Sequence, residues 1–318
     1  MKTWLAIALV ALFPAGAYSA ESHRIGVVVL PTGTGKAYHE TFRAALRKLG
    51  YVEGKNLILD ARVPDAQLKQ LPAIVEELIA LKPDVLVGWE PAVVAMHERT
   101  KAIPIVLRSS GDPAVAGIVK SLARPGTNIT GITQLNELLP AKHIELMREI
   151  LPGMTRVGML VDHSQKACVA VAQTTRKAAE AVAAVFTPYD VEDNSGIERA
   201  FAKMRQQAPD VLLPCPSALL FSHRQLLFDS AIRLRVPLTS FIVDSVPDGV
   251  LFAHAANLHD IHRRLAVFVD KILKGARPED LPIERPTKFE LVINLKVAKA
   301  LGLTIPQSVL LRADRVIE

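Results

Sequence analysis

RIGVVVL, at residues 24–30, is a continuous apolar run without alternating polar residues. Such a run is typical of a strand that is buried on both faces of a parallel sheet. Strand-like and helical segments alternate after it. The strands are predicted at 56–62, 84–88 and 103–107, and the helices at 38–49, 68–81, 91–100 and 115–123. This alternation predicts an α/β fold in which right-handed crossovers connect parallel strands.

The second half of the chain repeats features of the first half. Three pairs of segments match in the same order and at nearly the same separation. They are RIGVVV (24–29) with TRVGMLV (155–161), PDVLV (83–87) with PDVLL (209–213), and IPI (103–105) with VPL (236–238). Ordered matches of this kind indicate an internal duplication. We therefore predict two Rossmann-like parallel-sheet lobes that face each other.

The C-terminal segments are too few for a third lobe, so we assign them to the first two. They are a predicted helix at 257–274, a strand at 289–293, and a helix at 295–301 that Asn294 caps and Gly302 ends.

The chain would then cross between the lobes three times, near 131–133, 249–253 and 286–288. Lobe one would comprise residues 24–131 plus 251–286, and lobe two residues 132–250 plus 287–318. Three crossing strands would form a hinge between the lobes.

The N-terminus has the pattern of a cleaved signal peptide at residues 1–20. Lys2 supplies a positive charge, residues 4–15 are largely apolar, and small residues follow up to Ala20. The apolar run is too short for a membrane anchor. Because no cysteine lies near the cleavage zone, we expect a periplasmic protein that is secreted through a cleaved signal peptide and is not a lipoprotein.

Composition narrows the classes of partner. The net charge of +6 is spread over 318 residues, and charges of both signs are mixed along the chain, so we expect no nucleic-acid partner. We also expect the protein to be a monomer. Cys168 and Cys215 are the two cysteines of the chain. They could form a disulfide in an oxidising compartment or remain buried thiols, and we expect free thiols.

Ligands of open parallel sheets bind beyond the carboxyl ends of the strands. The loops at these ends carry hydroxyl groups, charges and one tryptophan, which suit a small polar ligand. The candidate ligand-binding residues are Thr32, Thr34, Trp89, Glu90, Arg108, Ser110 and Asp112 in lobe one, and His163, Ser164, Ser217 and Asp244 in lobe two. His163 either donates to the ligand or belongs to a solvated loop.

The charged candidates suggest a zwitterionic ligand such as an amino acid. Arg108 either clamps a ligand carboxylate or pairs with Glu90 or Asp112. Glu90, Asp112 or Asp244 would form an ion pair with a ligand ammonium group. Trp89 either stacks on the ligand or packs against a neighbouring helix.

Signals of catalysis are weak, and we predict no catalytic residue, metal or cofactor. Gly33-Thr34-Gly35-Lys36 lacks the first glycine and the final hydroxyl residue of a phosphate-binding loop. The chain contains neither a G-x-S-x-G elbow nor an H-E-x-x-H motif. His254, His259 and His262 are close in sequence, but no cysteine or carboxylate cluster supports a metal site.

Several long strings resemble the ABC-transporter substrate-binding proteins of the tryptophan/tyrosine-binding type. The most specific are LGYVEGKN (49–56), SLARPGTNITG (121–131) and PTKFELVINLK (286–296). The resemblance covers residues 24–318. It implies a type I periplasmic binding fold, hinge closure on a small solute, and an ABC permease in the inner membrane as partner. A sensory role, in which the same lobes report a ligand to a signalling partner, is the alternative.

The resemblance is weaker at the predicted cleft. Trp89-Glu90-Pro91-Ala92 stands where relatives usually carry Gly-Thr-Pro-Ala, and Asp162-His163 where many have Asn-Pro. Ala253-His254-Ala255 replaces Ser-Tyr-Gly, and Arg108 replaces a small or apolar residue. Some relatives bind aromatic amino acids, whereas these differences favour a more polar or charged ligand.

Overall fold

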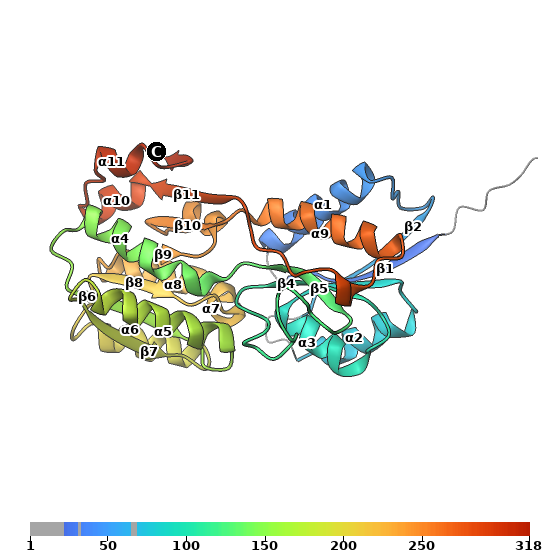
Figure 1. The fold of residues 1–318 in the computed structure, drawn as a ribbon. Helices are drawn as coiled ribbons and strands as arrows, with labels where there is room; N and C mark the ends of the chain where they lie inside the picture. Colours follow the sequence, from blue (N-terminus) through green and yellow to red (C-terminus); the bar gives the residue numbers. More distant parts are fainter. Residues whose placement is uncertain (1–21, 31–32, 65–68) are drawn as a thin grey trace, which may run out of the picture.

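Two α/β lobes lie side by side in the computed structural model, and three chain segments connect them (Figure 1). The structure describes residues 22–30, 33–64 and 69–318, and of residues 33–34 only the backbone. The predicted signal peptide and Thr32 lie outside the described residues, as does the side chain of Thr34. No helix in these described ranges is long and apolar enough to cross a membrane.

Lobe one contains a five-stranded parallel sheet in the order β2-β1-β3-β4-β5. Helices α1 and α9 bury their apolar side chains against one face of this sheet, and α2 and α3 cover the other face. Its elements are β1 (His23–Val28), α1 (Gly33–Lys48), β2 (Leu57–Arg62), α2 (Leu71–Ala80), β3 (Val85–Trp89), α3 (Glu90–Arg99), β4 (Ile105–Ser109), β5 (Ile129–Thr133), α9 (Leu258–Leu273) and η3 (Pro278–Asp280).

Lobe two contains the strand order β7-β6-β8, which a bridge between Leu212 and Leu238 joins to the order β9-β10-β11-β12. Only β10 and β11 pair in antiparallel orientation. Its elements are η1 (Asn136–Leu138), α4 (Pro140–Ile150), β6 (Arg156–Val161), α5 (Lys166–Glu180), β7 (Val185–Asp190), α6 (Asn194–Met204), β8 (Val211–Pro214), α7 (Ala218–Ser222), α8 (Arg224–Arg233), β9 (Thr239–Ser240), η2 (Val243–Asp248), β10 (Phe252–Ala256), β11 (Phe289–Asn294), α10 (Leu295–Leu301), α11 (Gln307–Leu310) and β12 (Arg315–Ile317).

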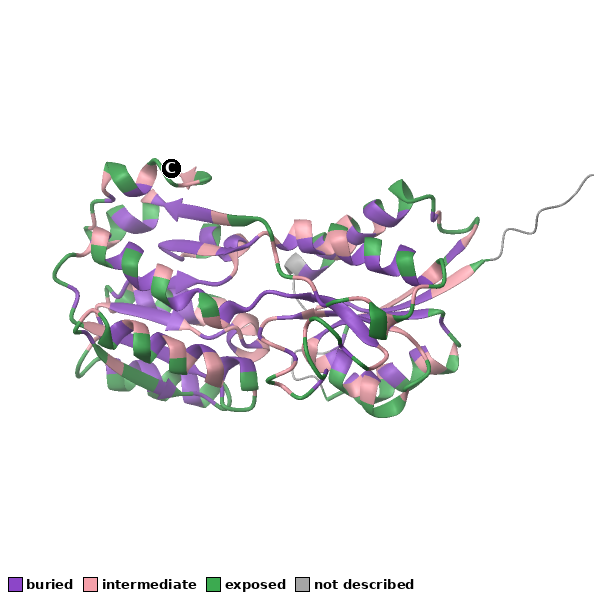
Figure 2. Ribbon diagram, viewed as in Figure 1, coloured by how far each residue is buried: buried purple, intermediate pink, exposed green. Residues whose placement is uncertain are grey.

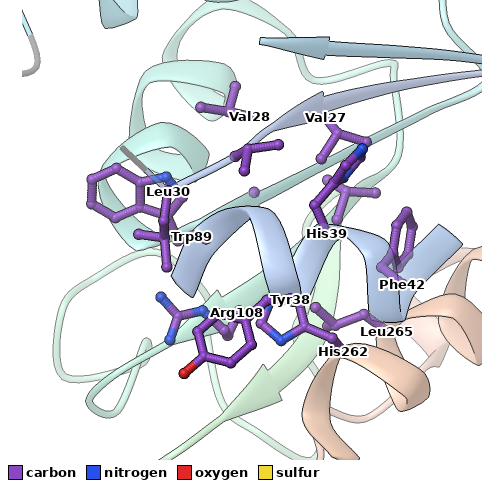
Figure 3. Close-up of a pocket in the computed structure, with 14 residues that line it drawn as sticks. Val27, Val28, Leu30, Tyr38, His39, Phe42, Trp89, Arg108, His262 and Leu265 are labelled. Carbon is purple, nitrogen blue, oxygen red and sulfur yellow. The ribbon is translucent and has the colours of Figure 1, made fainter. Parts of the chain in front are cut away.

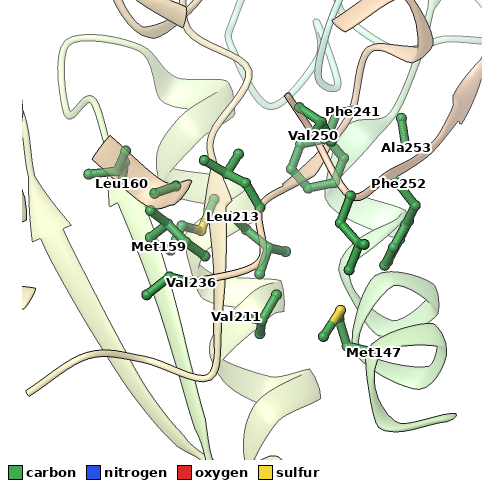
Figure 4. Close-up of a cluster of buried hydrophobic side chains, with 14 of the residues drawn as sticks. Met147, Met159, Leu160, Val211, Leu213, Val236, Phe241, Val250, Phe252 and Ala253 are labelled. Atoms are coloured by element: carbon green, nitrogen blue, oxygen red, sulfur yellow. The ribbon is translucent and has the colours of Figure 1, made fainter. Parts of the chain in front are cut away.

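Each lobe has its own buried core, and exposed residues lie on the outer helix faces (Figure 2). Figure 4 shows part of the lobe-two core, where side chains from β6, β8 and β10 meet Met147 of α4. This separation of cores is what two independently packed lobes require. The predicted α/β fold class, with parallel sheets in two lobes, is confirmed.

Equivalent hydrogen bonds occur at the start of β1 and at the start of β6, as expected for two duplicated lobes. In lobe one, the Asp84 carboxylate accepts from the Arg24 backbone N–H at 2.7 Å. In lobe two, the Asp210 carboxylate accepts from the Arg156 N–H at 2.9 Å. These aspartates belong to the repeated Pro-Asp-Val-Leu segment, so the sequence repeat corresponds to the same local structure in both lobes.

The three connections hydrogen-bond to one another. Glu284 donates its N–H to the Gly131 carbonyl at 2.9 Å, and Asn257 donates to the Lys288 carbonyl at 3.0 Å. Gly131 has a φ of +145°, and a Cβ there would lie 2.1 Å from the Leu107 carbonyl oxygen. Glycine is therefore required where β5 leaves lobe one.

Two predictions of chain path were wrong. The middle crossing lies at Asn257 and not at 249–253, because β10 pairs with β9 and β11 and so belongs to lobe two. Residues 251–256 therefore do not belong to lobe one. The predicted helix at 115–123 is a series of turns and bends, in which Gly117 takes a left-handed φ of +78°.

The expectation of free thiols was also wrong. Cys168 and Cys215 form a disulfide with a Cα–Cα distance of 5.2 Å, and both residues are buried. Cys168 lies near the start of α5, and Cys215 directly follows β8. The packing of α5 against the neighbouring strands brings these positions together, which sequence spacing alone does not reveal.

Candidate functional site

A cleft of about 740 Å³, partly open to solvent, lies between the carboxyl ends of the two sheets. Both lobes and the first connection contribute to its walls. The lining residues are Leu30, Tyr38, Trp89, Glu90, Pro91, Arg108, Ser110, Gln134, Asn136, Gln165, Pro216, Ser217, Ala218, Phe221, Ser222, Phe241, Ile242 and Leu258. The position agrees with the strand-end rule, and the mixture of aromatic and polar side chains suits a small organic ligand.

Arg108 supplies the positive charge of the lobe-one wall. It lies near the end of β4, half-buried, and donates to the Gln134 side-chain oxygen at 3.0 Å. Burial lowers the pKa of Arg108, and the neighbouring Tyr38 and Glu90 partly offset that shift. Within the described part of the chain, Arg108 forms no ion pair with a carboxylate, so the predicted pairing with Glu90 or Asp112 is absent.

Two buried polar atoms in the same region have no hydrogen-bond partner among the described residues. They are the Trp89 Nε1–H and the Asn136 Oδ1, and these residues are 6% and 2% exposed. A buried polar group without a partner costs free energy of roughly 1–3 kcal/mol. A donor and an acceptor are thus left at the cleft for a further partner.

In the lobe-two wall, the polar groups around Asp162 hydrogen-bond one another. Asp162 follows β6, and its buried carboxylate accepts from the Ser217 hydroxyl at 2.6 Å and from the Ser164 hydroxyl at 2.5 Å. It also accepts from the Gln165 side-chain amide at 3.2 Å. Ser217 and Gln165 line the cleft, whereas Ser164 does not.

Other predicted ligand residues lie outside the cleft lining. His163 points to solvent and hydrogen-bonds Asp190 at 2.8 Å, with both side chains more than half exposed. Asp112 accepts from the Ala114 N–H at 2.8 Å in its own loop. Asp244 accepts from the hydroxyl of Tyr38, a cleft residue, and so contributes indirectly. The fold brings five of the predicted residues together in the cleft lining, namely Trp89, Glu90, Arg108, Ser110 and Ser217.

The sequence reasoning missed several lining residues, mainly Gln134, Asn136, Gln165, Phe221 and Phe241. Gln134 directly follows β5, Asn136 lies three residues after its end, and Phe241 directly follows β9. Both strands end at the cleft, so the strand-end rule would have found these positions. The rule misses them because the sequence at 131–133 is typical of a crossing between lobes and β9 is only two residues long.

A smaller hollow of about 410 Å³, also partly open to solvent, adjoins the cleft in lobe one (Figure 3). The two spaces share Leu30, Tyr38, Trp89 and Arg108. In Figure 3, Arg108 and His262 lie beside Tyr38, whose ring stacks on His262 at 5.0 Å between centroids. Burial lowers the pKa of His262 to about 3, and nearby Arg108 adds to the shift. His262 is therefore neutral at pH 7, and its ring packs against that of Tyr38.

The two lobes also touch each other directly. The Tyr38 hydroxyl of lobe one donates to Asp244 of lobe two, and the Lys166 ammonium donates to the Ala116 carbonyl at 3.0 Å. The chain is therefore seen with its lobes in contact. Among the described residues, no three His, Cys, Asp or Glu side chains cluster as a metal site would require.

Comparisons with known proteins agree with this architecture. The family model described as "ABC transporter substrate binding protein" matches residues 25–317. A curated relative, "Tyrosine-binding protein" from Clostridioides difficile, is 23% identical over 263 residues, which span 82% of this chain and 75% of the relative.

Solved structures show the same fold. A conserved domain protein from Vibrio cholerae matches with a TM-score of 0.86 and 26% identity, covering 93% of this chain and all of that one. An ABC domain in complex with L-Trp from Streptococcus pneumonia matches with a TM-score of 0.84 and 24% identity, covering 92% and 100%.

Because the family model spans nearly the whole described chain, the protein belongs to the ABC transporter substrate-binding protein family. Its fold is the type I periplasmic binding fold, as the resemblance implied. Members of this family are substrate-binding proteins and not enzymes.

Proposed function

We propose that the chain is the periplasmic solute-binding component of an ABC importer and that it binds a small carboxylate, such as an amino acid, between its lobes. The observation that carries the ligand class is Arg108, a half-buried cation at the cleft whose hydrogen bond goes to the neutral Gln134 amide. A guanidinium can bind a carboxylate through two parallel hydrogen bonds. The amino acids named for two relatives, tyrosine and L-Trp, are carboxylates of this kind.

The rest of the cleft supports an amphoteric ligand. The Asn136 Oδ1 can accept from an ammonium or hydroxyl group, and the Glu90 carboxylate lies on the same wall. Trp89, Phe221 and Phe241 provide apolar and aromatic surface for the body of the ligand. Partner and location rest on the family and on the predicted signal peptide: an inner-membrane permease and the periplasm.

Calorimetric titration of the purified protein with the twenty amino acids tests the ligand class. Each amino acid that binds is compared with its carboxamide, which has the same side chain but no negative charge. We expect the acid to bind and the amide to bind at least tenfold more weakly, since it lacks the ionic partner of Arg108. Equal binding of acid and amide, or binding of neutral sugars only, would overturn the proposal.

Transport and sensing are separated by an uptake measurement. Cells that lack this chain should lose uptake of the bound solute if it serves an importer. Unchanged uptake, together with loss of a transcriptional response to the solute, would favour the sensory alternative.

A further inference from the structure

Asp162 is the centre of a hydrogen-bond network behind the lobe-two wall. Its Oδ1 accepts from the backbone N–H of Ser164 at 3.0 Å and from the hydroxyl of the same residue at 2.5 Å. Its Oδ2 accepts from Ser217 at 2.6 Å and from Gln165 at 3.2 Å. Asp162 is 3% exposed, and no cation of the described chain pairs with it. Its charge is therefore balanced by hydrogen-bond donors alone.

The disulfide joins the same two chain segments that Asp162 joins. Cys168 lies three residues after Gln165, and Cys215 lies two residues before Ser217. The backbone N–H of Asp162 also donates to the Cys215 sulfur at 3.4 Å. Segments 162–168 and 215–217 are thus held together by one covalent bond and several hydrogen bonds.

These two segments carry cleft residues. Gln165 and Ser217 line the cleft, and Gln165 donates to the Ser217 hydroxyl at 3.4 Å. Ser217 also caps α7 by accepting from the Leu219 N–H at 3.1 Å. Phe221 of α7 is a further lining residue, so its position depends on the same cap. Movement of either segment would displace polar and aromatic contacts together.

We propose that Asp162 and the Cys168–Cys215 bond are positioning elements that preorganise the lobe-two half of the ligand site. They need not touch the ligand; they fix Gln165, Ser217 and α7 before the lobes close. The proposal rests on the proposed function, because it assigns these residues to the binding of a ligand in the cleft. A preorganised wall avoids the entropy cost of ordering these side chains during binding.

The chain offers a matched control for Asp162. Asp210 lies at the opposite end of the same sheet and also accepts several hydrogen bonds, from the Thr155 N–H at 2.8 Å and the Arg156 N–H at 2.9 Å. It does not line the inter-lobe cleft. Loss of either carboxylate should therefore destabilise lobe two, but only loss of Asp162 should affect the ligand site.

The experiment compares wild type with D162A, D162N, D210A and the double variant C168A/C215A. Amide hydrogen exchange of the ligand-free proteins is measured by mass spectrometry, and L-tyrosine and L-tryptophan are titrated calorimetrically. We expect faster exchange at 162–168 and 215–222 in D162A and in the double variant. We also expect Kd to rise about tenfold there, as two or three side chains lose their fixed positions. D162N keeps one acceptor oxygen and should recover part of the affinity.

D210A should shift the melting temperature and alter exchange near 155–156 and 209–211, with Kd within about twofold of wild type. Unchanged exchange at the cleft segments in D162A would overturn the proposal, as would an equal loss of affinity in D162A and D210A. If neither of these two amino acids binds wild type, the exchange measurement alone decides on the positioning role, whereas the proposed ligand class is decided separately by the titration with all twenty amino acids. If the double variant does not fold, D162A and D162N still provide the test.

Discussion

The two walls of the cleft are built from equivalent ends of two related sheets, yet their polar groups are satisfied differently. On the lobe-one side, Arg108 has a neutral partner, and Trp89 Nε1 is buried without a partner among the residues that the structure describes. On the lobe-two side, Asp162 receives hydrogen bonds from Ser164, Gln165 and Ser217, and a disulfide joins the segments that carry them.

This difference indicates that the two lobes have different roles in ligand binding. Buried polar groups without partners are costly, so a protein that keeps them gains most when a ligand supplies the missing partner. Groups that already pair with one another instead provide a rigid surface. Lobe one would thus recognise the ligand, while lobe two would close on it with a preformed wall.

Replacing Arg108 should have the largest effect and is the strongest test of the different roles of the two lobes. We expect R108A to weaken binding of the carboxylate that wild type recognises by roughly 10- to 100-fold, because a hydrogen bond to a charged group contributes about 1.5–3 kcal/mol. Calorimetric titration measures the change. R99A, which removes a surface ion pair of the same lobe, serves as control and should bind normally. Unchanged affinity in R108A would contradict the recognition role of lobe one.

Acidification should lower the stability of lobe two because of a buried histidine. His143 of α4 is fully buried, hydrogen-bonds the His254 carbonyl at 2.8 Å, and burial lowers its pKa from 6.5 to about 3. Between these values the unfolded state binds more protons, so stability falls as the pH decreases below 6.5. From pH 7 to 4.5 the loss through His143 alone should be roughly 2–3 kcal/mol.

Urea unfolding at a series of pH values checks this. H143Q is expected to be less stable at pH 7, but its stability should depend less on pH over this window. His262 in lobe one contributes in the same direction, so some pH dependence should remain. Equal pH slopes in wild type and H143Q would contradict the assignment.

A subtler change sharpens the comparison at Trp89. W89F keeps an aromatic ring in the wall but removes the unpaired N–H donor. If the ligand accepts from this donor, affinity should fall about threefold to tenfold, the contribution of one neutral hydrogen bond. Loss of the donor alone should not lower the melting temperature of the ligand-free protein, because the donor has no partner among the described residues, but the smaller ring should lower it through lost core packing. Undiminished affinity would show that Trp89 contributes only apolar surface.

The smallest effect is expected at the contact between lobes. K166A removes the hydrogen bond from the Lys166 ammonium to Ala116, which lies at the exposed rim. Affinity should fall less than about threefold, since exposed contacts of charged groups contribute little. Small-angle scattering of the ligand-free protein should show a slightly larger radius of gyration. A radius identical to that of wild type would mean that this contact does not hold the lobes together.

Much of the fold was predictable because its signals are local. Most of the RIGVVVL run forms β1, an interior strand of the lobe-one sheet between β2 and β3. Asn294 and Gly302 cap α10 as predicted, with Gly302 at a φ of +73°. The wrong predictions concern segments whose structure depends on contacts with distant parts of the chain or on a single glycine. Residues 252–256 joined lobe two because β9 and β11 pair with them, and Gly117 broke a segment with helical spacing.

The candidate site was predictable in position but only partly in its members. The ends of buried strands mark the cleft, and Trp89, Glu90, Arg108, Ser110 and Ser217 do line it. His163 was chosen by the same rule, yet it turns outward to Asp190. A strand end fixes where the backbone arrives, whereas the direction of the side chain depends on what packs around it.

The sequence by itself determined the α/β class and the family, since apolar periodicity, capping residues and the family's characteristic strings each lie within a short stretch of the chain. Only the tertiary structure decided that Cys168 meets Cys215, that Asp162 accepts hydrogen bonds from Ser217 and its neighbours, and that Arg108 lines the cleft with no carboxylate partner in the described part of the chain. These features join residues that are distant in sequence, and their contacts arise only when helices, strands and lobes pack together.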